Sequence, residues 1–168
     1  MIRSCTPIIA GIALFGSMSV VPAEPLPTET FKVLPAALAV EAAQAAVAAC
    51  KSQGYNVVVA IVDRAGDLKL LLVGDGAAAL DRSLSRRKAY TSARLRISTG
   101  ELAKQIAAPG AFNPTLYDRQ MVTDPGGVPI KVGNETIGAV GVAGAPGSGQ
   151  EDVDCANDGL AKIRDRLN

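Results

Sequence analysis

The sequence predicts an α+β fold in which a single antiparallel sheet packs against helices. Two pairs of β-rich runs are each joined by a short turn that contains glycine, which is typical of hairpins. Helical patterns precede, separate and follow these hairpins, so the expected order is α-ββ-αα-ββ-α. A length of 168 residues suits one globular domain.

The first helix is expected to run from Pro35 to about residue 53. Proline suits the first turn of a helix, the middle of this segment is rich in alanine, and Gly54 suits the position just after the helix end. Two strands follow at about 56–63 and 68–73. Both are apolar on both faces, whereas an antiparallel sheet usually leaves one face polar. We therefore expect cover on both faces, by helices on one side and by helices or a partner subunit on the other.

A second helix is expected at 77–96 and a third from Ser98 to about residue 107, because Ser98 and Glu101 have the spacing of a capping box. Residues 108–128 form a long irregular segment with three prolines, and such loops in a compact domain are usually functional or disordered. A second hairpin covers 129–144 and turns at Gly133-Asn134. The final helix is expected at 151–168. Glycines at every third position of the last strand indicate close packing of a helix on that strand; they are Gly138, Gly141 and Gly144.

Residues 1–23 have the features of a cleaved secretory signal peptide. A short positive start is followed by an apolar stretch and by small residues that suit cleavage after Ala23. The alternative, a membrane anchor, is less favoured because the run is short and interrupted by proline, glycine and polar residues. Residues 24–34 are expected to be an extended lead-in and 35–168 the domain. The predicted location is periplasmic or secreted.

The mature chain keeps two cysteines, Cys50 and Cys155, each on an expected helix. An exported compartment permits a disulfide between them, and two buried thiols are the alternative.

Composition excludes several classes of function. The chain has no histidine, which rules out Ser-His-Asp and Cys-His nucleophile systems. Aromatic residues make up 4%, too few for a platform on which nucleic-acid bases stack. There are 17 Lys and Arg against 16 Asp and Glu, so no strong field favours DNA or a membrane surface.

Three segments in order resemble the GlcG/HbpS-like family, which is related to the C-terminal domain of PduO-type proteins. They are AACKSQGYNVVVAIVDRAGDLKLLLVGDGA, SRRKAYTSARLRIST and PGGVPIKVGNETIGAVGVAGAPGSGQEDVDCANDGLAKI. The resemblance covers about residues 35–165. It implies a profilin-like fold, a homo-oligomer and, in several members, the binding of haem or a related tetrapyrrole.

The haem expected from this resemblance directs attention to a basic cluster in and after the second helix. Its residues are Arg82, Arg86, Arg87, Lys88, Arg94, Arg96 and Lys104. This cluster is either a solvated helix face or, in part, the partner of an anionic group such as a haem propionate. Lys88 belongs to the family-like piece KAYTSA, and we expect it to face the site.

The remaining candidates lie between the third helix and the second hairpin. Without histidine, the iron has either an open coordination position or a ligand such as tyrosine, methionine or cysteine, and we take Tyr117 as the first candidate and Met121 as the second. Arg119 is a further candidate for holding an anion. Gly126 and Gly127 open the turn that we expect to border the pocket.

The leading hypothesis is an exported, homo-oligomeric haem-binding protein engaged in haem handling or oxidative-stress sensing, rather than an enzyme. One alternative is an enzyme acting on a small organic acid or a tetrapyrrole, with Lys88 and Arg119 holding the anion. The other is a structural assembly without a ligand.

Overall fold

The computed structural model describes residues 29–167, and the predicted signal peptide lies outside them. The described chain contains the expected order of elements. The first half comprises α1 (Ala36–Ser52), β1 (Val58–Asp63), β2 (Leu68–Val73) and α2 (Ala79–Leu95). The second half comprises α3 (Thr99–Ile106), β3 (Gly127–Val132), β4 (Glu135–Ala143) and α4 (Gln150–Ile163). One 3₁₀ turn, Pro114–Leu116, lies between α3 and β3. A second, Arg164–Arg166, follows α4, so the last α-helix ends earlier than expected.

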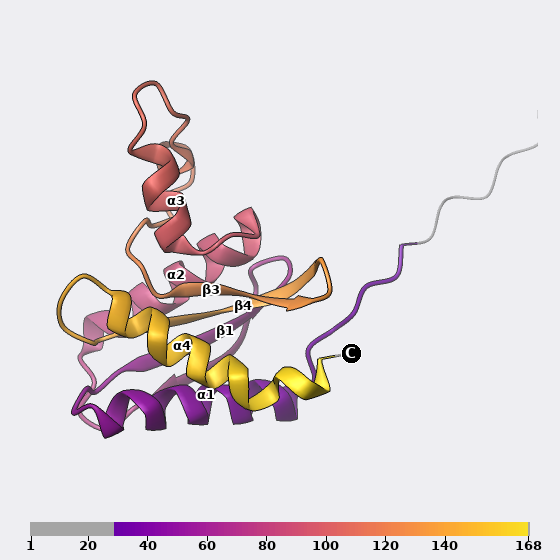
Figure 1. Cartoon of the computed structure of the whole chain (residues 1–168), viewed down its shortest axis with the longest axis vertical. Coiled ribbons are helices and arrows are strands. Elements are labelled where there is room, and N and C mark those ends of the chain that lie inside the picture. The colour runs from indigo at the N-terminus through magenta and orange to yellow at the C-terminus, as the bar shows by residue number, and fades with distance from the viewer. Residues whose placement is uncertain (1–28, 168) are drawn as a thin grey trace, which may run out of the picture. The chain divides into compact units, whose positions relative to one another are not determined.

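The four strands form one antiparallel sheet in the order β2-β1-β4-β3. The two central strands are almost fully buried, which explains why their sequences are apolar on both faces. Helices α1 and α4 lie side by side on one face of the sheet and α2 covers the other (Figure 1). The expectation of cover on both faces is therefore confirmed, with helices on each side.

Small residues allow these layers to approach closely. A Cβ atom at Gly141 on β4 would collide with the backbone of α2 at Ser85 and Ala89. A Cβ atom at Gly159 on α4 would lie 2.6 Å from the carbonyl oxygen of Ala42 on α1. Of the three glycines in the last strand, Gly141 has the helix-packing role that the sequence predicts, whereas a Cβ atom at Gly138 would meet the Val62 carbonyl of the neighbouring strand and one at Gly144 the Asn56 carbonyl.

The disulfide that the sequence favours is present and joins Cys50 on α1 to Cys155 on α4, with the two Cα atoms 5.5 Å apart. Both cysteines are fully buried between the helices and the sheet. The predicted cap of α3 is also present, because the Ser98 hydroxyl accepts a hydrogen bond from the Glu101 backbone N–H at 3.1 Å.

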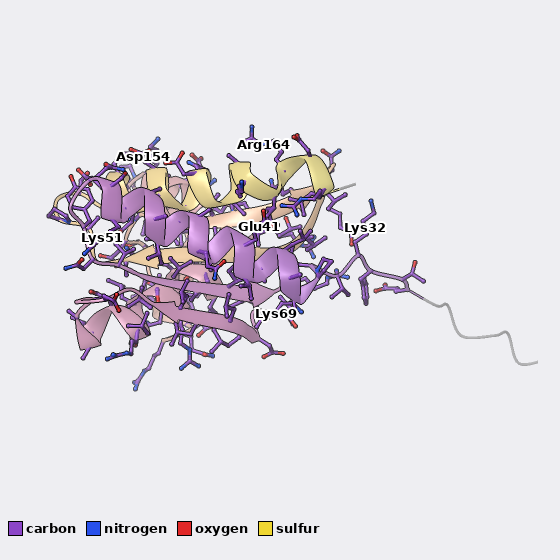
Figure 2. All side chains as sticks on the ribbon, turned by 90° about the horizontal axis from the view of Figure 1, so that it is seen from below. Lys32, Glu41, Lys51, Lys69, Asp154 and Arg164 are labelled. Carbon is purple, nitrogen blue, oxygen red and sulfur yellow. A yellow bond between two sulfur atoms is a disulfide. The ribbon has the colours of Figure 1, made fainter. Side chains whose placement is uncertain are left out.

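The two edges of the sheet differ. The edge strand β3 contains Pro129, which has no backbone N–H to offer to another strand. The edge strand β2 has the sequence LKLLLV and is partly exposed, with Leu68 44% accessible. Figure 2 shows Lys69 on this outer strand. It also labels Glu41 on α1 and Asp154 on α4, the two helices that pack side by side.

Within residues 29–167, no helix has both the length and the apolar character needed to cross a membrane.

Candidate functional site

A cavity of about 520 Å³ lies between β2 and α2 and is called here the β2 cavity. Its floor is apolar and is formed by Val62 from β1 and by Leu68 and Leu71 from β2. Because β2 is an edge strand, these side chains lack the full cover that the central strands receive. The cavity therefore offers an apolar surface at the margin of the sheet.

Three arginines from α2 line the same cavity. Arg82 and Arg86 are four residues apart, so they extend from the same side of the helix, and Arg87 follows. No carboxylate of the described chain forms an ion pair with any of the three. The cavity thus combines an apolar floor with unpaired positive charge, an arrangement suited to an apolar molecule that carries anionic groups.

Arg87 also fixes the loop that follows α3. Its guanidinium donates hydrogen bonds to the carbonyl oxygens of Arg119 at 2.9 Å, Gln120 at 3.4 Å and Met121 at 3.2 Å. Gln120 itself lines the β2 cavity. Arg87 is therefore one of the α2 side chains that attach the long irregular segment to the cavity wall, and the Thr91 hydroxyl, which accepts the Val122 backbone N–H at 2.9 Å, is another.

Tyr90 lies one turn beyond Arg86 and also lines the β2 cavity. Its hydroxyl donates a hydrogen bond to a carboxylate oxygen of Asp118 at 2.8 Å. This bond to Asp118, followed by burial and the negative charge of Asp118, raises the pKa of Tyr90 above its usual value, and Arg94 opposes the shift more weakly. The phenol therefore stays protonated at neutral pH.

Lys88 lines a different cavity of about 390 Å³, called here the Lys88 cavity. Its ammonium group forms an ion pair with Asp152 at 2.7 Å, and each side chain is only 3% exposed. The other oxygen of Asp152 accepts the backbone N–H of Ala145 at 3.0 Å. Burial raises the pKa of Asp152, although the hydrogen bond and the charge of Lys88 act in the opposite direction.

The Lys88 cavity is unsuited to an anion. Asp81 and Asp124 line it together with Asp152, so three carboxyl groups surround one ammonium group that already has a partner. The structure places Gly126 and Gly127 in close contact with Lys88. A Cβ atom at Gly126 would lie 2.9 Å from the Lys88 ammonium nitrogen, and one at Gly127 would collide with the Lys88 carbonyl.

The other predicted residues lie on the loop between α3 and β3. Tyr117 is 79% exposed, and its ring stacks on Phe112 with centroids 5.2 Å apart. Arg119 is exposed, Met121 is half-buried, and the Arg87 contacts hold the backbone of both. The structure thus divides the predicted residues between the Lys88 cavity and the loop that borders the β2 cavity.

Sequence reasoning missed the floor of the β2 cavity and gave Arg82 and Arg86 no individual role. The available signal was the spacing of these two arginines together with an apolar strand at 68–73. It could not be used without knowing that this strand forms the edge of the sheet beside α2. Among residues 29–167, no group of three or more His, Cys, Asp or Glu side chains is placed to hold a metal ion.

Comparisons with known proteins give one consistent picture. A family model described as "Haem degrading protein HbpS-like" matches residues 34–161. The crystal structure of HbpS is 37% identical, covers 84% of this chain and 97% of its own, and superposes with a TM-score of 0.74. ORFY from Klebsiella pneumoniae is 26% identical, with 84% and 98% covered and a TM-score of 0.76. A complex of PduOC with haem is 27% identical, with 79% and 96% covered and a TM-score of 0.71.

We predict that the buried ion pair depends on both partners. Asp152→Asn leaves the Lys88 ammonium without a counter-charge and should lower the free energy of unfolding by about 3–5 kcal/mol. The double variant Lys88→Met/Asp152→Leu removes both charges and should regain most of that loss. Urea denaturation at neutral pH measures both.

The exposed ion pair between Arg166 and Glu41, also 2.7 Å long, supplies the control. Glu41→Gln should cost less than about 1 kcal/mol because solvent screens an exposed pair. Equal losses for Asp152→Asn and Glu41→Gln would contradict the assignment of a buried, mutually dependent pair.

Proposed function

The chain belongs to the HbpS-like family, and from this premise we propose that it is an exported protein that binds haem and assembles as a homo-oligomer. The observation that carries the proposal is the β2 cavity, with its apolar floor and three arginines that have no carboxylate partner, of which Arg82 and Arg86 are also free of the backbone bonds that Arg87 makes. Haem has an apolar macrocycle and two carboxylate groups, so it matches both features. The complex of PduOC with haem, a protein of similar fold, supports the choice of ligand.

We place haem in the β2 cavity rather than beside Lys88. The propionates would meet Arg82 and Arg86 at the rim of the β2 cavity, and the macrocycle would cover Leu68 and Leu71. In the Lys88 cavity the same propionates would face three aspartates. Lys88, Gly126 and Gly127 then act by supporting α2 and the start of β3, not by touching the ligand.

The chain offers few candidates for an iron ligand because it has no histidine. The Tyr90 hydroxyl already donates a hydrogen bond to Asp118 at 2.8 Å, so Tyr90 is a poor ligand. Tyr117 is exposed and lies three residues from Gln120 in the cavity wall, and we retain it as the proposed ligand, with Met121 as the alternative. Bound haem would supply a redox-active iron at this position.

Two features support export to the periplasm or the medium. Residues 1–23 have the pattern of a signal peptide with cleavage after Ala23. The domain contains the Cys50–Cys155 disulfide, and such bonds persist mainly in oxidising compartments.

The open edge of β2 is the subunit contact that we propose for the homo-oligomer. Strand β2 has no strand neighbour on its outer side within the described chain, and an uncovered apolar edge favours pairing with another chain. A two-fold axis at Leu72 would bring Lys69 of one copy towards Asp75 of the other, which lies in the turn directly after β2. The pairing would also enclose the β2 cavity, because Leu68 and Leu71 lie on this strand.

Haem breakdown is the second candidate function, and the description of the family model favours it. Turnover differs from binding in a simple way. With a reductant and oxygen, and with catalase present to remove peroxide, an enzyme would destroy many equivalents of haem per chain, whereas a binding protein would keep the Soret band of a stoichiometric complex.

We predict that haem-free protein titrated with hemin gives a saturable Soret shift at one haem per chain. Arg82→Glu/Arg86→Glu should weaken binding by at least about tenfold, because the propionates would then meet like charge. Lys104→Glu/Lys162→Glu makes the same change in net charge on α3 and α4 and should bind as the wild type does. A flat titration of the wild type, or equal losses in both double variants, would refute the site.

Tyr117→Phe tests the iron ligand separately in the same titration. It should change the position of the visible charge-transfer bands of the ferric complex while leaving the stoichiometry intact, because only the ligand to the iron is lost. An unchanged spectrum would exclude Tyr117 and leave Met121 as the candidate.

For the assembly, we predict that Lys69→Glu lowers the oligomeric state measured by sedimentation velocity, because like charges then face each other across the β2 edges. Lys69→Glu/Asp75→Lys should restore it by exchanging the two charges. Lys131→Glu on the opposite edge strand is the control. Assembly of Lys69→Glu identical to wild type, or no recovery in the exchanged variant, would show that the contact lies elsewhere.

A further inference from the structure

A third cavity of about 380 Å³ lies where the turn between β1 and β2 meets the end of α2, and is called here the hairpin cavity. Its lining includes Arg64 from the turn and Arg94 and Arg96 from the end of α2. Thr136 at the start of β4 adds a hydroxyl group to the wall. The fold thus brings together three guanidinium groups from two segments that are thirty residues apart.

The positive charges around the hairpin cavity lack carboxylate partners. Among residues 29–167, the two ion pairs within 4.0 Å are Lys88–Asp152 and Arg166–Glu41, and neither is at this cavity. Asp63 is the nearest acidic residue in sequence to Arg64, but one of its oxygens accepts the backbone N–H groups of Ala65 and Asp67 at 2.8 and 3.0 Å. Three like charges around one cavity repel one another, and a bound anion would relieve that repulsion.

Arg64 has a buried donor that is unsatisfied. Its Nη1 atom is inaccessible to solvent and has no hydrogen-bond partner. The guanidinium is held over the ring of Phe31, 3.7 Å from its centroid, by a cation–π contact. Buried N–H groups are nearly always paired, so an orphan of this kind points to a missing acceptor.

Arg96 adds an independent observation. It has φ 61° and ψ 21° at the C-cap of α2, and it is the one residue other than glycine with positive φ in the described chain. Glycine is the usual residue at such a position because it has no side chain to strain the backbone. An arginine at this position strains the backbone, which lowers the stability of the fold, and its side chain lines the cavity.

We propose that the hairpin cavity binds a small oxyanion, the phosphate group of a soluble molecule, through Arg64, Arg94 and Arg96. Guanidinium groups present paired N–H donors that match the oxygens of phosphate, and the side chains of all three arginines line this cavity. The site is separate from the β2 cavity and does not depend on haem. It would give the protein a second ligand-binding site, whose lining shares no residue with that of the β2 cavity.

The test titrates the haem-free full chain with inorganic phosphate by calorimetry, at constant ionic strength kept with sodium chloride. Wild type should bind one phosphate saturably, and its melting temperature should rise with phosphate concentration. Arg64→Gln should lose at least about tenfold in affinity. Arg164→Gln removes the same charge from the exposed end of α4 and should bind phosphate unchanged.

Arg96→Gly separates a role in binding from a role in folding. Relief of the positive φ should raise the melting temperature without phosphate, while loss of the guanidinium should weaken phosphate binding. A variant that is more stable and still binds phosphate normally would overturn the role of Arg96. Wild type that responds to chloride and phosphate alike, or Arg64→Gln with unchanged affinity, would overturn the site.

Two further arms identify the source of the phosphate and its relation to haem. Glycerol phosphate should compete with inorganic phosphate, whereas vesicles of phosphatidic acid should not bind; binding of vesicles in place of glycerol phosphate would overturn the assignment to a soluble ligand. Hemin titration of Arg64→Gln should match wild type. A parallel loss of hemin affinity would show that the cavity belongs to the haem site and would overturn its independence.

Discussion

Close approach of backbones across both faces of the sheet is the constraint on which this structure depends. Gly141 lets α2 lie directly on β4, and Gly159 lets α4 lie directly on α1. Alanines extend the same contact, since Ala89 and Ala93 of α2 are buried against the sheet. A domain with 4% aromatic residues and no tryptophan builds its core this way, from small side chains at short separations rather than from large ones.

The same constraint explains why the charge of the domain gathers on α2. Small residues form the face of α2 that packs on the sheet, so its long charged side chains lie along the sides and at the ends of the helix. Arg82 and Arg86 line one cavity, Lys88 a second, and Arg94 a third. One helix therefore contributes cationic side chains to three cavities. In one of them, the Lys88 cavity, the cation already has a buried counter-ion, Asp152.

The fold was largely predictable, because its signals are local. Turn glycines, the Ser98 cap and the doubly apolar run at 57–62 gave the order of elements and the cover on both faces. The disulfide was favoured once the two cysteines were assigned to helices at either end of the domain. The sites were harder to predict from the sequence, because they depend on which strand lies at the edge of the sheet and on which carboxylate pairs with which cation.

Lys88 illustrates this limit. Its sequence context predicts a ligand contact, yet the structure gives it an ion pair with Asp152, a residue 64 positions away in the first turn of α4. No pattern in one sequence connects these two positions. Conversely, Arg64 stands in a turn, and the three-dimensional structure is needed to place it at a cavity beside Arg94 and Arg96.

The disulfide has a consequence for resistance to proteolysis. It links the first helix of the domain to the last across 105 positions, so the exposed loop between α3 and β3 lies inside a covalently closed ring. A protease that cleaved this loop would leave two fragments still tied together, each contributing strands to the same sheet. Under oxidising conditions a single cut would nick the molecule without releasing either half.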